Sequence, residues 1–399
     1  MNSTPTSERT HIAIFGRRNA GKSSLINAVT GQELAVVSDV KGTTTDPVSK
    51  AMELLPLGPV VIIDTPGLDD EGALGELRVK KAYQVLNRTD IALLVIDSAE
   101  GFSDADRLIL DRIKAKNIPY ITVMNKSDLL PEVPADEENR IWVSSETHYN
   151  INKLKELMAR QLKTDDSGKK IVGDLIKEGD NVVLVVPIDK AAPKGRLILP
   201  QQQTIRDLLD HGASAVVCKD NMLADTLKNF REKPAMVITD SQVFKEVSPV
   251  VPADIPLTSF SILFARYKGN LAQAVKGVAA LKNLKDGDTV LIAEGCTHHR
   301  QCNDIGTVKI PAWIKQCTGK ELNFEFTSGT GFPDSLSGYS LIVHCGGCML
   351  NEREIKYRLS CAEDEGIPVT NYGILIAYVT GILKRSVEIF PDIAAEIKD

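Results

Sequence analysis

Between residues 11 and 160, short apolar runs alternate with amphipathic stretches, and each run ends in a polar or glycine-rich turn. The clearest runs are HIAIFG, VVIIDTPG, DIALLVIDS and PYITVMNKSD. Strands buried on both faces are continuously apolar, and their alternation with helices is typical of βαβ units. This part of the chain therefore predicts a parallel sheet flanked by helices.

The alternation stops at KTDDSGKK, residues 163–170, which is polar and has no periodicity, as expected of a linker between domains. It resumes at Asn181 with three strand-like runs, NVVLVVPID, ASAVVC and PAMVITD. Helix-like segments separate them, at residues 204–209 and 222–230. We therefore expect a second, smaller α/β layer, which carries no chemical motif.

A third part follows the proline-rich VVPADIP, with a helical pattern in LAQAVKGVAALKNL and strand-like TVLIAEG and SLIVH. The predicted domains are residues 1–165, 170–262 and 265–399, and all three are α/β. No internal repeat at a fixed period is apparent.

Composition narrows the classes of function. The 399 residues are 43% hydrophobic and 25% charged, as in ordinary globular proteins, which excludes wholesale disorder. The net charge is −6, so no overall positive potential attracts nucleic acid. Aromatic residues are only 5%, which leaves few side chains on which unpaired bases could stack. The apolar stretch Gly373 to Leu383 is 11 residues long, against the ~20 that span a bilayer. The polar N-terminus lacks the apolar core of a secretory signal. We expect a cytoplasmic protein without membrane or nucleic-acid partners.

The strand Ile12 to Phe15 is followed by GRRNAGKS, which fits the phosphate-binding pattern G-x-x-x-x-G-K-[ST]. In such loops backbone N–H groups surround the phosphates, the lysine contributes a positive charge, and the serine hydroxyl binds Mg²⁺. A glycine turn between core elements is the alternative, and the flanking strand and helix disfavour it. The candidate nucleotide-binding residues here are Gly16, Asn19, Ala20, Gly21, Lys22, Ser23 and Ser24.

Two further motifs follow predicted strands in the order expected of a guanine nucleotide site. Asp64-Thr65-Pro66-Gly67 ends VVIID and offers a carboxylate to Mg²⁺ and the Gly67 N–H to a γ-phosphate. Asn125-Lys126-Ser127-Asp128 follows YITVM. The Asp128 carboxylate can accept from the N1–H and the N2 amine of guanine together, a donor pair that adenine lacks, so the site discriminates by roughly 10⁴-fold or more.

Through GRRNAGKSS, GTTTD, DTPG, NKSD and Val143-Ser144-Ser145, residues 9 to 162 resemble the TrmE-Era-EngA-like GTPases. The resemblance implies that Thr44 binds Mg²⁺ from switch I and that Ser144 and Ser145 approach the guanine O6. It also implies that Asn19 binds K⁺ beside the phosphates. The predicted catalytic residues are Lys22, Thr44 and Gly67. Leu68 replaces the water-orienting glutamine of Ras-like switches, which implies slow basal turnover.

Cysteine usage adds a second kind of chemistry. None of the seven cysteines precedes Cys218, and six lie between Cys296 and Cys361, a clustering that favours metal binding over disulfides in a cytoplasmic chain. Cys296 follows one predicted strand, and Cys345 and Cys348 follow another. Zinc completed by His298 or His344, an iron–sulfur cluster with a weaker fourth ligand, and structural thiols that bind no metal are all open. The other cysteines, Cys218, Cys302, Cys317 and Cys361, are expected to be buried small hydrophobes.

A TrmE-like GTPase domain joined to C-x-H and H-C-x-x-C resembles the FeFe-hydrogenase maturation GTPases over nearly the whole chain, including EGCTHHRQCNDIGTVKIP and HCGGCMLNEREI. The resemblance implies a homodimer whose C-terminal domain binds a 4Fe-4S cluster through Cys296, Cys345 and Cys348. His298, His344 and Asp304 are candidates for a fourth ligand or for tuning. It also implies that a diiron precursor, with CO and CN⁻ ligands made by two radical SAM maturases, is assembled on this cluster and passed to apo FeFe-hydrogenase. The cofactors implied are GTP/GDP, Mg²⁺, K⁺ and the cluster.

Two other classes of function compete with this interpretation. One is an RNA-directed GTPase, for tRNA modification or ribosome assembly, with a structural zinc site. The acidic balance and scarce aromatics disfavour it. The other is a redox-sensing GTPase in which Cys345 and Cys348 form a disulfide.

Overall fold

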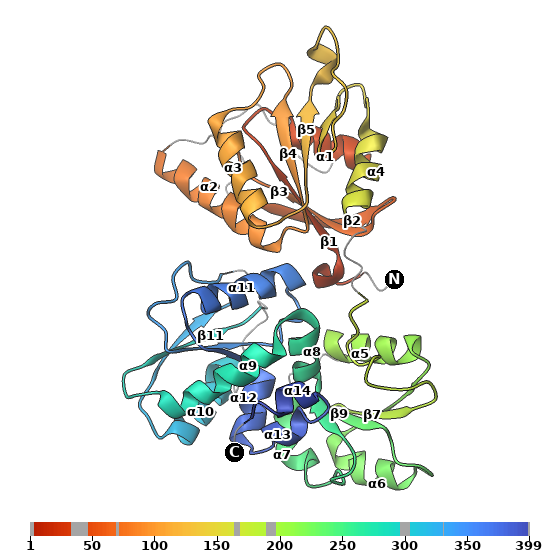
Figure 1. The fold of residues 1–399 in the computed structure, drawn as a ribbon, viewed down its shortest axis with the longest axis vertical. Coiled ribbons are helices and arrows are strands. Elements are labelled where there is room, and N and C mark those ends of the chain that lie inside the picture. Colours follow the sequence, from red (N-terminus) through yellow and green to blue (C-terminus); the bar gives the residue numbers. More distant parts are fainter. Residues whose placement is uncertain are drawn as a thin grey trace. The chain divides into compact units, whose positions relative to one another are not determined.

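The computed structural model describes residues 4–32, 47–68, 72–162, 168–188, 197–295, 304–329 and 331–397. The chain forms two compact units, residues 1–167 and 168–399, each considered by itself below (Figure 1).

The N-terminal unit is built on a six-stranded sheet in the order β2-β3-β1-β4-β5-β6, parallel except for β2, which pairs antiparallel with β3. The four apolar runs predicted as strands are β1, β3, β4 and β5, so that prediction is confirmed. The strands are β1 (Thr10–Phe15), β2 (Val48–Leu54), β3 (Gly58–Asp64), β4 (Ile91–Asp97), β5 (Tyr120–Asn125) and β6 (Arg140–Trp142). The helices are α1 (Lys22–Thr30), α2 (Gly72–Val85), α3 (Asp104–Ala115) and α4 (Ile151–Leu162).

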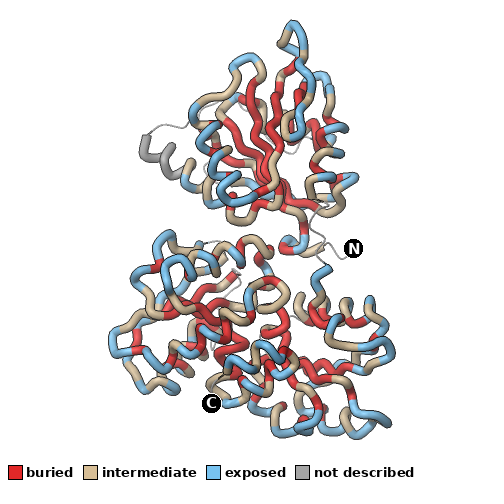
Figure 2. Tube along the Cα trace, viewed as in Figure 1, coloured by how far each residue is buried: buried red, intermediate tan, exposed pale blue. Residues whose placement is uncertain are grey.

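The central strands β1, β3, β4 and β5 are buried on both faces, which fits their nearly continuous apolar sequences (Figure 2). Because successive side chains of a strand point to opposite faces, Ile12 and Ile14 pack with Leu25 and Leu154 in one cluster. Phe15 belongs to the cluster on the other face. The carboxyl ends of parallel strands share one edge, and this edge gathers the turns after β1, β3 and β5, which carry the three nucleotide motifs.

The second unit contains two four-stranded parallel sheets, in the orders β10-β9-β7-β8 and β12-β11-β13-β14. We call residues 168–268 the first lobe and residues 269–397 the second lobe. The first lobe has β7 (Asn181–Val185), α5 (Leu199–Asp210), β8 (Ser214–Cys218), α6 (Leu223–Lys228), β9 (Met236–Thr239), α7 (Phe244–Val247), β10 (Leu257–Ser259) and α8 (Phe260–Lys268). The second has α9 (Leu271–Val278), β11 (Thr289–Ala293), α10 (Ile310–Thr318), β12 (Asn323–Thr327), β13 (Leu341–His344), α11 (Glu352–Asp364), β14 (Val369–Asn371), α12 (Tyr372–Val379), α13 (Leu383–Ser386) and α14 (Pro391–Ala394).

The strand-like runs predicted in this half are confirmed as β7, β8, β9, β11 and β13, and the apolar stretch near the C-terminus is the buried helix α12. The α/β class is thus confirmed throughout. The predicted boundary between residues 262 and 265 falls inside α8, which directly continues the last strand of the first lobe.

The two lobes have the same topology. When the strands of each lobe are numbered in chain order, both sheets run 2-1-3-4. Equivalent backbone hydrogen bonds occur at the ends of the central strands: Asp240 N–H donates to Val185 O at 3.3 Å, and Cys345 N–H donates to Ala293 O at 3.0 Å. The lobes are therefore two copies of one βα arrangement.

The sequence carries the trace of this repeat. IPLTSFSILFARYKG, residues 255–269, aligns with IPVTNYGILIAYVTG, residues 367–381, without a gap. The identical pairs are Ile255 and Ile367, Pro256 and Pro368, Thr258 and Thr370, Ile262 and Ile374, Leu263 and Leu375, Ala265 and Ala377, and Gly269 and Gly381. KEGDNVVLVV at 177–186 likewise aligns with KDGDTVLIAE at 285–294. The spacing differs between the two pairs of stretches, so the two lobes are related by a repeat that has no fixed period.

The lobes meet through equivalent residues of α8 and α12. A Cβ placed on Gly373 would lie 2.5 Å from the Cβ of Ser261, its counterpart in the repeat, so one of the two has to be glycine. Asn371 Nδ2 donates to Ser261 O at 3.2 Å. Contact between equivalent residues is what an approximate two-fold relation produces. Buried residues of both lobes, such as Phe264 and Leu375, belong to one continuous apolar core.

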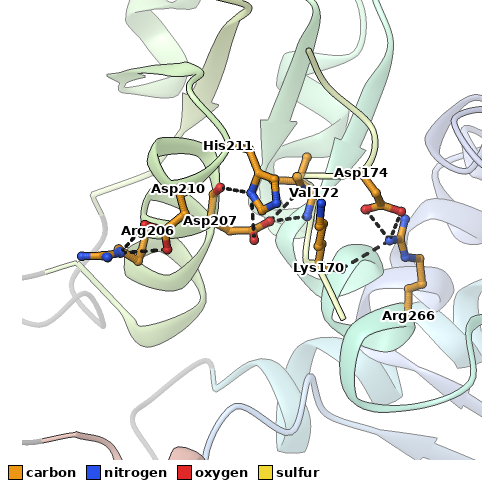
Figure 3. Close-up of polar contacts among 9 residues, drawn as sticks. Lys170, Val172, Asp174, Arg206, Asp207, Asp210, His211 and Arg266 are labelled. Carbon is orange, nitrogen blue, oxygen red and sulfur yellow. Dashed lines mark hydrogen bonds and ion pairs between the residues drawn. The ribbon is translucent and has the colours of Figure 1, made fainter. Parts of the chain in front are cut away.

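The chain segment that enters the first lobe is fastened to α5 (Figure 3). Asp207 Oδ2 accepts hydrogen bonds from Val172 N at 2.8 Å and from Gly173 N at 2.7 Å. The His211 ring covers Gly173 so closely that an added Cβ would lie 2.2 Å from Nδ1. A glycine is therefore required where the segment passes this ring.

Candidate functional site

The loop Gly16–Ser23 connects β1 to α1 at the sheet edge. Gly16 has φ of 148° and approaches β4 so closely that a Cβ would lie 2.3 Å from Val95 O. Lys22 Nζ donates to Gly16 O at 2.9 Å and to Arg17 O at 2.7 Å, so its ammonium group lies against the loop. This is the geometry expected of a phosphate-binding lysine.

Asp64 ends β3 beside this loop. Burial raises the pKa of its carboxyl, while the charge of Lys22 and a hydrogen bond with the Ser23 side chain act in the opposite direction. Its Oδ1 is buried and finds no hydrogen-bond partner among the described residues. A buried carboxylate oxygen next to a serine hydroxyl fits Mg²⁺, which takes oxygen ligands.

Asn125 joins the phosphate loop to the turn after β6. Its Nδ2 donates to Ala20 O at 3.1 Å, and its Oδ1 accepts from Ser145 N at 3.1 Å and from Ser145 Oγ at 2.8 Å. Ser144 Oγ in turn accepts from Thr147 N at 3.1 Å. Sequence reasoning placed Asn125 in a motif but missed this bracing role, because its partners lie 20 and 105 residues away.

The remaining residues of the guanine motif lie at the same edge. Asp128 is exposed on the turn after β5. Lys126 has φ of 60°, and its Nζ donates to Asp97 Oδ2 at 2.6 Å. Asn19 also has φ of 60°. Gly67 follows β3 as predicted, whereas Thr44 lies outside the described residues.

Cys345 and Cys348 occupy the turn after β13 in the second lobe. The chain leaves β11 toward β12 on one side of the sheet, and β13 lies on the other, so this turn stands where the strand order reverses. Open α/β sheets bind ligands at that point. Cys345 Sγ accepts from Gly295 N at 3.0 Å and from Gly347 N at 3.4 Å. Two backbone N–H groups are therefore directed at this sulfur.

Cys348 is half-buried, and the last residue of α8, Lys268, contacts its backbone. Burial raises the pKa of its thiol, Cys345 raises it further, and the charge of Lys268 acts in the opposite direction. Lys268 Nζ donates to Leu350 O at 3.1 Å and to Cys348 O at 3.4 Å. Lys268 is only 4% exposed, and no sequence motif marks it.

His344 is the last residue of β13 and is buried. Its Nε2 lies 3.2 Å from Arg358 Nη1, and its Nδ1 lies 2.7 Å from Cys345 O. Because a guanidinium can only donate, Nε2 accepts, and Nδ1 carries the proton that Cys345 O accepts. Arg358 is itself held by Glu354 Oε1 at 2.9 Å and Gly329 O at 2.7 Å. Both ring nitrogens of His344 are therefore engaged.

The other turn of the predicted site follows β11, and the structure describes only its two ends, up to Gly295 and from Asp304. Asp304 Oδ2 accepts from Thr307 N at 2.9 Å, which caps the helical turn that follows. Glu294, the residue after β11, accepts from Tyr372 OH at 3.2 Å. Cys296 and His298 lie outside the described residues, and within the described part of the chain no three His, Cys, Asp or Glu side chains form a metal site.

The structure also tests the predicted burial of the other cysteines and the prediction that the chain does not span a membrane. Cys317 lies exposed near the end of α10, so the expectation that it is buried is wrong, whereas Cys218 and Cys361 are half-buried. Cys302 lies outside the described residues. None of the described helices is both long and apolar enough to span a bilayer.

Comparison with known families matches three consecutive segments. A 50S ribosome-binding GTPase model matches residues 11–126, a hydrogen maturase F (HydF) dimerization domain matches residues 171–269, and a HydF tetramerization domain matches residues 272–389. The last two correspond closely to the two lobes. Their names indicate that the second unit takes part in oligomerization.

Similar curated proteins match only the N-terminal unit. The tRNA modification GTPase MnmE of Chromobacterium violaceum is 36% identical over 153 residues, which are 37% of this chain and 34% of the relative. GTPase Der of Kosmotoga olearia is 39% identical over 126 residues, 30% of this chain and 28% of the relative. The chain thus spans about a third of the length of the curated relatives it matches.

Among solved structures, Era in complex with MgGDPNP and a 16S ribosomal RNA segment is 22% identical, with a TM-score of 0.35, and covers 53% of this chain and 91% of its own. The family assignment rests on the family models. The two HydF domains together match more than half of the 399 residues and follow a P-loop GTPase domain. The chain therefore belongs to the HydF family.

Proposed function

We propose that this protein is a GTP-hydrolysing scaffold that binds a 4Fe-4S cluster through Cys296, Cys345 and Cys348. A diiron precursor would be assembled on the cluster and delivered to apo FeFe-hydrogenase. The observation that carries the proposal is the position of Cys345 and Cys348, at the strand-order reversal of the second lobe, with backbone N–H groups directed at the Cys345 sulfur.

In the N-terminal unit each motif has one proposed role. Lys22 places its charge on the β- and γ-phosphates, Ser23 and Thr44 bind Mg²⁺ with Asp64 beside them, and Gly67 donates to the γ-phosphate. Asp128 selects guanine, and Ser144 and Ser145 approach its O6. Mg²⁺, when bound, supplies the positive charge that neutralises the transferred phosphoryl group. The buried Oδ1 of Asp64 supports this ligand set.

Asn19 is proposed to bind K⁺ beside the phosphates, where a second cation substitutes for an arginine finger. Its place in the loop between β1 and α1, before Lys22, supports this proposal. We expect faster hydrolysis in K⁺ than in Na⁺ at equal ionic strength, measured as phosphate release. Equal rates in the two salts would remove K⁺ from the site.

In the second lobe three thiolates leave one position of a cluster for a weaker ligand, which suits a scaffold that has to attach and release a second unit. His298 and Asp304 remain candidates for that position. For His344 we propose a supporting role instead, because Arg358 and Cys345 O occupy its ring nitrogens.

The proposed assembly is a cytoplasmic homodimer that meets two radical SAM maturases and apo FeFe-hydrogenase in turn. The nucleotide state of the N-terminal unit would act as the switch, since γ-phosphate and Mg²⁺ order the loops around Thr44 and Gly67 and so change contacts with partners. We propose a functional division into the GTPase domain, the first lobe for dimerization, and the second lobe for the cluster.

The test is the identity and count of metal in anaerobically purified and reconstituted full-length protein, with EPR of the reduced form. We expect about four irons and four sulfides per chain and a reduced-cluster signal. Cys348→Ala should abolish or alter that signal. Cys317→Ala is the matched control, because Cys317 lies exposed on α10, and it should keep the iron.

Stoichiometric zinc without iron uptake would contradict the scaffold and favour the RNA-directed GTPase with a structural metal. Salt-sensitive RNA binding would then be the next measurement.

A further inference from the structure

Lys268 is an unusual residue in the second unit because lysine is almost never fully buried. It is the last residue of α8 in the first lobe, yet its ammonium group donates to Cys348 O and Leu350 O of the cysteine turn in the second lobe. The Nζ also lies 6.0 Å from the centroid of the Phe264 ring on its own helix. Burying this charge costs free energy, and the hydrogen bonds to the two backbone oxygens of the cysteine turn offset part of that cost.

The repeat within the unit provides an internal comparison. In the aligned stretches 255–269 and 367–381, the counterpart of Lys268 is Thr380, one residue beyond the end of α12. Thr380 Oγ1 donates to Ile376 O at 2.6 Å and Ala377 O at 3.3 Å, both within its own helix. These two hydrogen bonds lie at the C-terminal end of its own helix, whereas those of Lys268 reach the other lobe. The shared fold therefore does not require a buried cation here.

The turn after β9 in the first lobe is the counterpart of the cysteine turn after β13, and it has no cysteine. In the repeat, Asp240 of the first lobe makes the backbone hydrogen bond that Cys345 makes in the second. Val243, three residues after Asp240, stands where the second lobe has Cys348. A buried lysine thus accompanies the turn that has two thiols, whereas its counterpart in the repeat is a threonine that bonds only to its own helix in the contacts above.

From this geometry we infer that Lys268 is a positioning residue of the cysteine site. Its ammonium group holds the backbone from Cys348 to Leu350 in place and puts a positive charge at the turn that carries both thiols, which strengthens binding of a metal ion or cluster by the thiolates. The inference rests on the proposed function only in that the thiolates bind metal. Groups that hold metal ligands from outside typically change metal affinity by 10- to 100-fold when removed.

The test uses Co²⁺ as the probe, added anaerobically to metal-free full-length protein and followed through thiolate-to-cobalt absorption. Lys268→Met should weaken Co²⁺ binding by about tenfold or more. Lys268→Arg, which keeps the charge and the donors, should restore most of the affinity, and Lys268→Gln, which keeps donors without charge, should fall between. The EPR signal of the reconstituted iron protein should change in Lys268→Met in parallel.

Lys309→Met is the matched control. Lys309 Nζ donates to Gln242 Oε1 at 3.1 Å, so it also links the second lobe to the first, but at the turn without cysteines. This variant should bind Co²⁺ like the wild type. GTP hydrolysis and the thermal unfolding midpoint of each variant report whether the protein is folded.

Wild-type Co²⁺ affinity in a folded Lys268→Met protein would overturn the inference and leave the proposed cluster intact. Equal loss in Lys268→Arg and Lys268→Met would also overturn it, because a charge and donor role predicts rescue. Absence of thiolate-to-cobalt absorption in the wild type would overturn the cysteine site itself and this inference with it.

Discussion

Lys22→Ala is expected to abolish GTP hydrolysis, with a loss of at least about 100-fold in the rate of phosphate release at saturating GTP. The Lys22 ammonium lies against the phosphate loop and supplies the charge that stabilises the transferring phosphoryl group. Iron content after reconstitution should stay at the wild-type value, since Cys345 and Cys348 belong to the other compact unit.

Lys153→Ala is the control for this change. Lys153 is an exposed lysine of the same unit whose Nζ donates to Asp136 Oδ2 at 2.6 Å, and exposed ion pairs contribute little. Its hydrolysis rate should match that of the wild type. Loss of iron in Lys22→Ala would show that the nucleotide and cysteine sites are not separable.

Gly21→Ala should reduce kcat/KM for GTP by about 100-fold, because a small displacement at a reacting centre has effects of that size. Gly21 precedes α1 with φ of 89°, and an added Cβ would lie 2.2 Å from Asn125 Nδ2. Asn125 would have to move, and with it the hydrogen bonds to Ala20 O and Ser145. The two loops that enclose the nucleotide would then separate.

Gly31→Ala separates this collision from backbone strain. Gly31 ends the same helix with φ of 67°, and an added Cβ meets nothing within 4 Å. An alanine there should cost about 1 kcal/mol of stability and leave kcat/KM unchanged. If the two variants lose activity equally, strain at the helix ends is responsible and the contact with Asn125 is not.

The fold of the N-terminal unit was predictable because its central strands are apolar throughout and each ends at a recognisable motif. The edge strand β2 was not, since most of its residues are exposed and it has no apolar pattern. The repeat of the two lobes was also not predicted from the sequence. Strand cores such as Val182–Val185 and Val290–Ala293 share little beyond apolar character, and the segments between the aligned stretches differ in length.

The site was predictable where chemistry depends on residues close in sequence. Lys22 and Ser23 are neighbours within one loop, and Cys345 and Cys348 within one turn. The interactions that decide how these residues behave come from far along the chain: Arg358 fixes His344 across 14 residues, and Lys268 reaches Cys348 across 80. No local pattern marks a buried lysine at a helix end, so only the packing of the two lobes reveals it.

The shared core of the two lobes limits how this protein can be divided for experiments. A fragment starting at residue 265 would begin inside α8 and lack Leu263 and Phe264, which pack in the common core. Removing each such side chain forfeits roughly 1.5–3 kcal/mol of burial. A recombinant piece meant for spectroscopy of the cysteine site therefore has to begin at about residue 168, where the second compact unit starts. Spectroscopy of a fragment that begins at residue 265 would describe a molecule that lacks part of its core.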